Sequence, residues 1–288
     1  MKVSPAQRRH DSYRKIKSNL MVGLTIGATV VALIPLFFVL GYLLSKGAAS
    51  VNWDFFTKMP VPVGQVGGGM ANAIVGTFEL VGLATLMGVP IGVGAGVYLA
   101  ENRGSQLAQV IRFAADVMMG IPTIVVGIFV YGIFVKPFYG FSTLSGAIAL
   151  AIIMIPLVTR TAEEMILLVP QEMREAALAL GVPSWRTTIS VVVRTAISGI
   201  ATGVILAVAR VAGETAPLLF TAFGNRFWST SLFQPISSLT VQVYTYAISP
   251  FADWQRQAWA GALVLTAIVL AMELGVRWMT RGSARVAR

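Results

Sequence analysis

The sequence predicts an all-α integral membrane protein with six transmembrane helices. Of its 288 residues, 56% are hydrophobic and only 12% are charged, and the mean hydropathy is +0.76. A soluble chain of this length could not cover so much apolar surface with so few charges, so its solvent is expected to be lipid. The second observation is the spacing of the apolar segments, which recur six times with polar stretches between them.

Each apolar segment is expected to form one span, and the six are residues 20–44, 72–99, 107–135, 144–158, 195–223 and 259–279. The first could also be the core of a cleaved signal peptide, because Ala48-Ala49-Ser50 follows it. It is too long for a signal core, so a retained anchor is predicted. Together, residues 20–280 are predicted to form one membrane domain between a basic tail at 1–19 and another at 281–288.

Three features within the spans carry specific expectations. Gly88, Gly92 and Gly96 fall on one helical face, a small-xxx-small pattern that lets a second helix approach closely. Arg112 and Asp116 lie at i,i+4, a spacing that favours an intrahelical pair. Residues 120–122, Gly-Ile-Pro, predict a bend in the third span.

The basic residues indicate the orientation. Most of the 22 Lys and Arg residues fall in the two tails and in the stretches that an even number of spans places on the same side as the tails. The positive-inside rule therefore predicts that both termini and the long loop at 160–194 are cytoplasmic. The net charge of +10 is then a topology signal, and no nucleic-acid partner is expected.

Residues 170–194 predict an ordered helix-turn-helix between the fourth and fifth spans. Pro170 suits the start of a helix, and a stripe of Met173, Ala176, Ala177 and Leu180 follows at helical spacing. Gly181 is expected to end this helix, and Pro183 to begin the next. Such an ordered loop is more typical of a docking element than of a tether.

Glu175-Ala176-Ala177, followed after three residues by Gly181, resembles the EAA loop of ABC importer permeases. The resemblance implies that this loop is cytoplasmic and couples to an ATPase subunit. The pattern of that family continues to Ile-x-Leu-Pro, and here the corresponding positions are Val191, Val193 and Arg194, so the proline is replaced. Trp185 beside Arg186 could anchor the loop in the ATPase groove, or Trp185 could pack against the loop's own helices.

Arg210 and Glu214 are charges inside the fifth span. An unpaired ion at mid-bilayer costs at least ~2.5–3.5 kcal/mol on insertion scales, so such residues usually face a polar interior. Their spacing predicts one helical face, on which they could simply neutralise each other. Alternatively, Arg210 lines the translocation path and attracts an oxyanion, while Glu214 holds Arg210 in position or accepts a hydrogen bond from a protonated oxyanion. Pro217 is expected to bend the helix just beyond them.

Residues 209–222, Ala-Arg-Val-Ala-Gly-Glu-Thr-Ala-Pro-Leu-Leu-Phe-Thr-Ala, resemble the fifth-span signature of phosphate importer permeases of the PstA type. The resemblance implies a type I (MetI-like) ABC importer permease fold in a bacterial or archaeal plasma membrane, with Arg210 and Glu214 at functional positions. It also implies a sister permease PstC, two copies of the ATPase PstB, an external phosphate-binding protein PstS, and phosphate as the substrate.

Several classes of function are disfavoured by what the sequence lacks. It has no Gly-x4-Gly-Lys-Ser/Thr motif, so ATP and Mg²⁺ are expected on a partner chain, and this chain is not expected to be an enzyme or to bind a cofactor. It has no cysteine and a single histidine, His10, which disfavours a metal site. The alternatives are a permease for sulfate or molybdate, and an ATP-independent channel or secondary transporter. Glu79, inside the second span, could be neutralised structurally or take part in transport.

Overall fold

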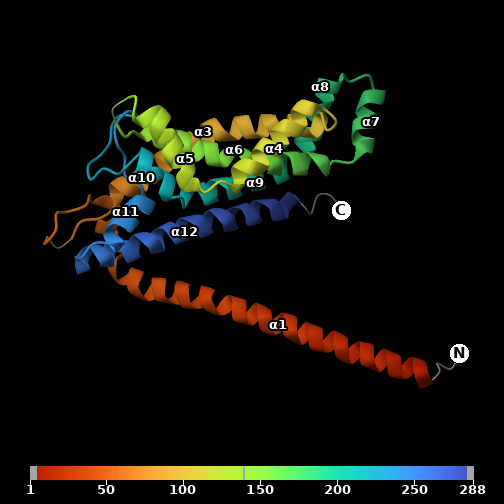
Figure 1. The fold of residues 1–288 in the computed structure, drawn as a ribbon, viewed down its shortest axis with the longest axis horizontal. Coiled ribbons are helices and arrows are strands. Elements are labelled where there is room, and N and C mark those ends of the chain that lie inside the picture. Colours follow the sequence, from red (N-terminus) through yellow and green to blue (C-terminus); the bar gives the residue numbers. More distant parts are fainter. Residues whose placement is uncertain (1–4, 66, 139, 284–288) are drawn as a thin grey trace.

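The computed structural model describes residues 5–65, 67–138 and 140–283, and within them the fold is helical. The only β-type pairing in this part of the chain is an isolated bridge between Phe223 and Ile236. The helices, shown in Figure 1, are α1 (Pro5–Gly47), α2 (Trp53–Thr57), α3 (Ala71–Glu101), α4 (Gln106–Gly120), α5 (Thr123–Val130), α6 (Thr143–Leu167), α7 (Gln171–Ala179), α8 (Ser184–Thr187), α9 (Arg194–Ala212), α10 (Ala216–Thr221), α11 (Leu239–Ala247) and α12 (Ala252–Ser283).

Five helical segments are long and apolar enough to cross a membrane, and a sixth is obtained if the bent pair α4–α5 counts as one span. The all-helical membrane fold predicted from the sequence is therefore confirmed. The two members of the bent pair meet at 103°, at the predicted Gly-Ile-Pro site. Pro122 has no N–H and fixes its own φ, which explains why α4 ends at Gly120 and α5 starts at Thr123.

The predicted glycine face is where α3 and α6 pack together. A Cβ atom on Gly92 would lie 2.7 Å from the Cβ of Val158, and one on Gly96 would lie 2.6 Å from the Cβ of Ala162. The missing side chains thus let the two backbones approach, as in small-residue helix pairs of membranes. Around this contact lies the main core, with Leu80, Leu150 and Met154 fully buried.

Three predicted boundaries are wrong. The fourth span continues to Leu167 instead of ending near residue 158, because charges of α4 neutralise those of its last turns. The fifth span is not one helix to residue 223: α9 ends at Ala212 and α10 begins at Ala216, since Gly213 ends the first segment. The sixth span begins before residue 259, because α12 starts at Ala252, and the polar stretch that precedes it contains α11.

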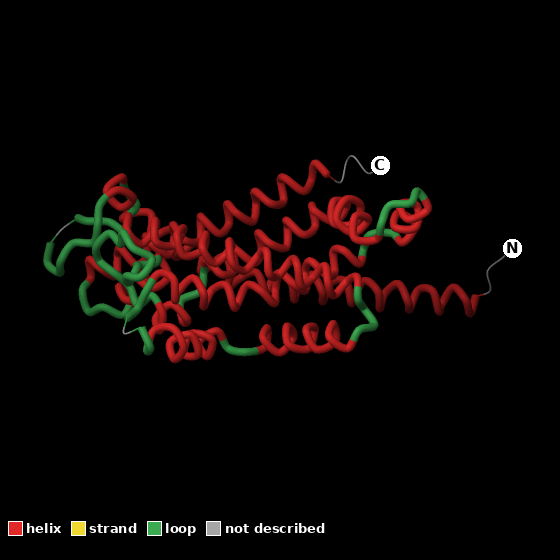
Figure 2. The backbone as a smooth tube through the Cα atoms, turned by 90° about the horizontal axis from the view of Figure 1, so that it is seen from above, coloured by secondary structure: helices red, strands yellow, loops and turns green. Residues whose placement is uncertain are grey.

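The two ends of the bundle differ. Most loops gather at one end, around α10 and α11, while the free ends of α1 and α12 point toward the other end, which carries α7 and α8 (Figures 1 and 2). Residues 5–19 of the predicted basic tail form the first turns of α1, and most of the predicted tail at 281–288 lies outside the described residues.

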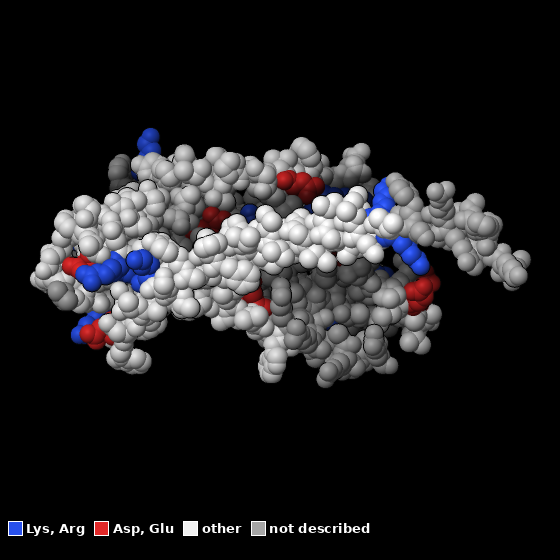
Figure 3. Space-filling model, turned by 90° about the horizontal axis from the view of Figure 1, so that it is seen from below, with Lys and Arg blue, Asp and Glu red and all other residues white. Residues whose placement is uncertain are grey.

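α1 stands apart from the bundle along most of its length. It approaches α12 near Gly47, where the Tyr42 and Trp259 rings meet edge to face with centroids 5.1 Å apart. The most apolar 18-residue window of this helix has no buried residue. Figure 3 shows the helix in the foreground as uncharged over most of its length, with charged side chains toward its ends. This surface fits a lipid environment.

Candidate functional sites

Arg210 lies in the last turn of α9, and its side chain is exposed. The sequence predicted that Arg210 and Glu214 share a helical face and can pair, and this prediction is wrong. The helix ends between them, with Gly213 and Glu214 donating their N–H groups to the carbonyls of Arg210 and Val211. Within the part of the chain that the structure describes, neither side chain forms an ion pair.

The helix break has a local cause. Gly213 costs helix stability because it lacks a side chain, and Pro217, in the first turn of α10, is pre-set for a new helix start. The bend is therefore four residues earlier than the predicted one at Pro217. The freed carbonyl of Glu214 accepts a hydrogen bond of 3.0 Å from the Thr240 hydroxyl of α11. Backbone of this kind is tolerated at membrane depth only where other groups satisfy it.

Arg210 borders a cavity of about 310 Å³. The bent pair α4–α5 and the middle of α6 provide its other walls, which are almost entirely apolar: Met118, Met119, Ile121, Thr123, Val125, Val126, Phe129, Ile152, Ile153 and Leu157. Among these described lining residues Arg210 is the only charged one. A guanidinium beside so many apolar groups attracts an anion more strongly than it would in bulk water.

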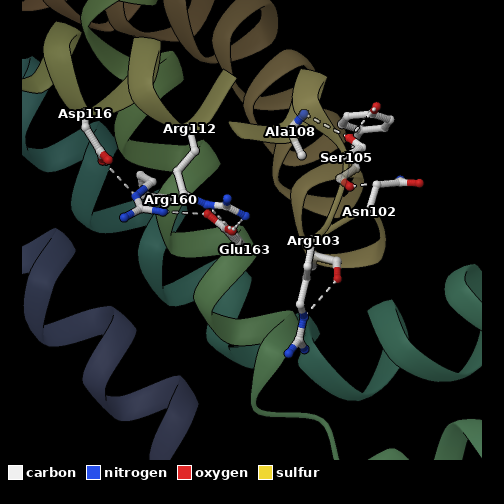
Figure 4. A network of polar contacts seen from close by, with 10 residues as sticks. Asn102, Arg103, Ser105, Ala108, Arg112, Asp116, Arg160 and Glu163 are labelled. Carbon is white, nitrogen blue, oxygen red and sulfur yellow. Dashed lines mark hydrogen bonds and ion pairs between the residues drawn. The ribbon is translucent and has the colours of Figure 1, made fainter. Parts of the chain in front are cut away.

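A second group of charges joins α4 to α6 (Figure 4). Glu163 is 2% exposed, and its Oε1 accepts from Arg112 Nε at 3.0 Å and from Arg112 Nη2 at 2.6 Å. Its Oε2 accepts from Arg160 Nη1 at 2.7 Å, and Arg160 Nε lies 3.0 Å from Asp116 Oδ1. We call these four residues the α4–α6 charge network.

This network overturns the expected i,i+4 pair within the third span, because Arg112 and Asp116 both turn toward α6 instead of toward each other. It also contains the residue that sequence reasoning missed, Glu163. The available signal was the run Arg160 to Glu164, whose charges fall at i,i+3 if the helix continues. The expected loop boundary at 160 concealed that signal.

The helix-turn-helix at 170–194 forms as predicted. Gly181 has φ +77, the left-handed conformation that favours glycine. Its N–H bonds to the carbonyl of Leu178, and the Val182 N–H bonds to that of Ala177, the two bonds of a Schellman helix end. α8, a π-helical turn at Thr188–Val193 and α9 then run on as one 29-residue segment, Ser184–Ala212.

Most of this loop faces outward. Of the predicted apolar stripe only Ala177 is buried, whereas Leu180 is 84% exposed. Glu175, Ala176 and Arg186 are exposed too, and Trp185 is 66% exposed. The sequence left open whether Trp185 packs against the loop itself, and the structure leaves this ring largely free. An exposed aromatic beside an arginine is a common interface anchor.

Glu101, at the end of α3, ties this loop to the bundle. Its Oε1 forms an ion pair with Arg174 of α7, and its Oε2 lies 3.1 Å from the Thr188 hydroxyl. That hydroxyl is also 3.1 Å from the Ser184 carbonyl, so its one proton serves either acceptor. Arg174 Nη2 also reaches the carbonyl of Ile166, at the end of α6, at 3.5 Å. We call Glu101, Arg174 and Thr188 the loop clamp.

Comparisons with known proteins fit this arrangement. The family described as "Binding-protein-dependent transport system inner membrane component" matches residues 88–285. Over 273 residues the chain is 45% identical to the phosphate transport system permease protein PstA of Yersinia pestis, covering 94% of this chain and 92% of that protein. The chain belongs to the PstA family of transport permeases. It is therefore a multi-pass membrane transport subunit and not an enzyme.

The PstA family relationship extends to archaea: the probable PstA of Methanocaldococcus jannaschii is 34% identical, covering 96% of this chain and 99% of that protein. Solved structures show the same fold. An inward-facing structure of the MetNI methionine ABC transporter gives a TM-score of 0.61 at 16% identity, covering 74% of this chain and 96% of that chain. The alginate ABC transporter gives 0.67 at 13% identity, with coverages of 93% and 96%. The predicted MetI-like fold is confirmed.

Proposed function

We propose that this chain forms half of the translocation pathway of an ATP-driven phosphate importer. The observation that carries the proposal is the position of Arg210, an arginine without an acidic partner among the described residues, on an apolar cavity at a broken helix. A guanidinium offers paired donors that match a tetrahedral oxyanion. Phosphate is favoured over sulfate or molybdate because the relatives covering nearly the whole chain are named phosphate transport permeases.

The second half of the pathway is assigned to a sister permease of the PstC type. An importer permease that works as a pair would place its substrate between the two subunits. Arg210 is exposed on this chain, which leaves it available to such an interface. Glu214, half-buried in the break, would accept a hydrogen bond from a protonated phosphate oxygen. An external binding protein of the PstS type would deliver the ion.

Energy enters through the loop at 170–194 in this proposal. Glu175, Ala176, Ala177, Trp185 and Arg186 present an exposed surface that would dock onto an ATPase of the PstB type, two copies of which carry ATP and Mg²⁺. Gly181 sets the turn between the two helices of that surface. Since the segment Ser184–Ala212 is continuous, a push on the loop would reach Arg210 through a single helical rod.

The orientation belongs to the same proposal, with both termini and the loop in the cytoplasm. The chain has no cysteine, so a single introduced cysteine reports the side of the membrane directly. Arg186→Cys is expected to react with an impermeant maleimide only after the cells are opened. Labelling from outside intact cells would reverse the orientation and remove the ATPase docking role.

The function itself is tested with purified complex in liposomes. We expect phosphate uptake that requires ATP, the ATPase and the binding protein, and that a tenfold excess of sulfate or molybdate does not inhibit. Strong inhibition by sulfate would identify another oxyanion importer. Phosphate flux through this chain alone, without ATP, would indicate a channel or a secondary transporter instead. Mass spectrometry of the co-purifying chains would identify the partners.

A further inference from the structure

A second cavity, of about 150 Å³, is lined by residues of α11 and of the segment after α10. Figure 1 shows α10 and α11 at the end of the molecule opposite α7 and α8. The lining residues of that segment and of α11 are Phe223, Gly224, Asn225, Arg226, Ser237, Val241, Gln242, Thr245 and Tyr246. Neither this segment nor α11 belongs to a candidate membrane span. Nothing in the proposed path through Arg210 uses these residues.

Two deeply buried polar groups of this cavity have no hydrogen bond of good geometry in the described chain, although their side chains lie close enough for the Gln242 amide to act on the Tyr246 hydroxyl. Gln242 is 7% exposed and Tyr246 is 2% exposed, and the unpartnered atoms are Gln242 Nε2 and Tyr246 Oη. The other end of the Gln242 amide is held by Ser237, whose hydroxyl donates to Oε1 at 2.9 Å. Leaving a buried polar group unpaired costs about 1–3 kcal/mol, so a bound species that pairs both groups would stabilise the fold.

The electrostatic character of the cavity is positive. The Arg226 guanidinium lies over the Trp254 ring at 4.8 Å from its centroid, and it forms no ion pair with any carboxylate of the described residues. No lining residue is acidic. Burial raises the pKa of the Tyr246 hydroxyl above its usual value, while hydrogen bonding with the Gln242 side chain and the charge of Arg226 act in the opposite direction, so this group remains a proton donor at neutral pH.

The backbone of the cavity wall is held in an unusual shape. Phe223 has φ 62 and is the only non-glycine residue of the described chain in the left-handed region, and Gly224 follows with φ 107. Such a conformation costs of order 1–3 kcal/mol and persists where surrounding contacts impose it. Here the contacts are the bridge to Ile236 and the stacking of the Phe223 ring on Phe141, with centroids 4.7 Å apart.

We infer that this cavity is a binding site for a small tetrahedral oxyanion, held by the Arg226 guanidinium, the Tyr246 hydroxyl and the Gln242 amide. Its volume is below the roughly 300 Å³ at which pockets begin to fit organic ligands, which favours an inorganic ion. The Thr240 hydroxyl of α11 bonds to the Glu214 carbonyl in the break beside Arg210. If the proposed function holds, the cavity is an outer waiting site from which phosphate passes toward Arg210.

The fluorescence of Trp254, whose ring lies under the Arg226 guanidinium, can report binding at this site. Purified complex without its binding protein is titrated with phosphate, sulfate and chloride at constant ionic strength, and the fluorescence change that disappears in Trp254→Phe is taken as the signal. We expect saturation with phosphate and no saturating response to chloride. Arg226→Gln should weaken binding at least tenfold, and Gln242→Leu severalfold. Arg256→Gln is the matched control, because that nearby arginine is exposed and already pairs with Asp253.

A binding signal that is absent or nonspecific would contradict the inference. No Trp254-dependent signal with phosphate or sulfate would mean that the cavity holds only water. A response to chloride equal to that for phosphate, or one that survives both Arg226→Gln and Gln242→Leu, would show nonspecific ion effects. The titration requires neither ATP nor uptake. A complex that binds phosphate at this site but transports none would contradict the proposed function alone. A complex that transports phosphate but does not bind it at this site would contradict only the inferred site.

Discussion

The α4–α6 charge network and Arg210 are two opposite ways of keeping arginines inside a membrane protein. In the network, Arg112 and Arg160 share the buried carboxylate of Glu163, and Asp116 completes a neutral group. Arg210 faces an apolar cavity and pairs with no acid of the described chain. The charges of the network neutralise one another, whereas the positive charge of Arg210 remains available to attract an anion.

This difference suits the network to stabilising the fold and Arg210 to the ligand binding that we propose. A neutral, hydrogen-bonded group at a helix–helix contact fixes geometry, and removing one member leaves the others uncompensated. An arginine without a partner contributes nothing comparable to the fold and costs energy in an apolar setting. Its retention is then best explained by a ligand. Substitutions in the two regions should therefore fail in different ways.

The largest effect is expected for Arg210→Ala. Without the guanidinium, phosphate loses its charge partner in the cavity, and we expect ATP-dependent uptake to fall at least a hundredfold in liposomes. The melting temperature of the complex should stay the same or rise, because no described residue loses an ion pair. Retained uptake would show that Arg210 is not on the path. Arg256→Gln, at an exposed arginine that pairs with Asp253 and lines neither cavity, serves as a control for the general loss of a positive charge.

In the α4–α6 charge network, Glu163→Gln should lower the stability of the fold, which Arg210→Ala should not. Two arginines, each 27% exposed, would face an amide in place of the carboxylate, so we expect a destabilisation of ~3 kcal/mol, at the lower end of the range for breaking a buried pair. Thermal unfolding in detergent measures it. Asp116→Asn is the matched control: this carboxylate is 47% exposed, and a loss below about 1 kcal/mol is expected. Equal losses would mean that Glu163 is not the centre of the network.

The sequence predicted the fold well wherever a pattern was local. Apolar length located the six spans approximately, the Gly-Ile-Pro run marked the bend, and Gly181 marked the turn of the loop at 170–194. These signals depend on covalent geometry or on one helix face, so a single sequence contains them. The likeness of residues 209–222 to a family signature also led to the correct family.

Pairing between distant segments was not predictable in the same way. Arg112 is i,i+4 from Asp116 but 51 residues from Glu163, and only the approach of α4 to α6 decides which acid it meets. The Arg210–Glu214 pair failed because a Gly-and-Pro-dependent break, rather than one continuous helix, separates the two residues. Glu101 and Arg174, 73 residues apart, were invisible as a pair for the same reason.

A smaller effect is expected when the network is disturbed through the backbone. A Cβ on Gly96 would lie 2.9 Å from the Glu163 nitrogen and 2.7 Å from the Thr159 carbonyl oxygen, so Gly96→Ala should push α6 away from α3. We expect a loss of about 1–3 kcal/mol, the usual range for overpacking. Gly94→Ala, on the same helix with nothing within 4 Å, should be neutral or stabilising in the same unfolding measurement. Equal losses would show that the close contact is not limiting.

The smallest effect should come from the loop clamp, which connects the docking surface to both regions of the comparison. Glu101→Gln removes the charge that holds Arg174, whose side chain is 17% exposed, while an amide can still meet Thr188. Because the loop would then yield under the push of the ATPase, we expect two- to fivefold more ATP hydrolysed per phosphate transported, with little change in the melting temperature. Glu164→Gln is the control, because Glu164 is an exposed glutamate in the last turn of α6 and is not part of the loop clamp.

The double variant Glu101→Arg with Arg174→Glu separates charge pairing from a general disturbance of the loop. If the attraction between α3 and α7 is what transmits the push, the reversed pair should return the ATP-to-phosphate ratio toward that of the parent, although each single reversal raises it. The rescue should also leave docking of the ATPase unchanged in a pull-down, since Glu175 and Trp185 are untouched. If all these variants keep the parent ratio, the continuous rod from Ser184 to Ala212 transmits the movement without the clamp.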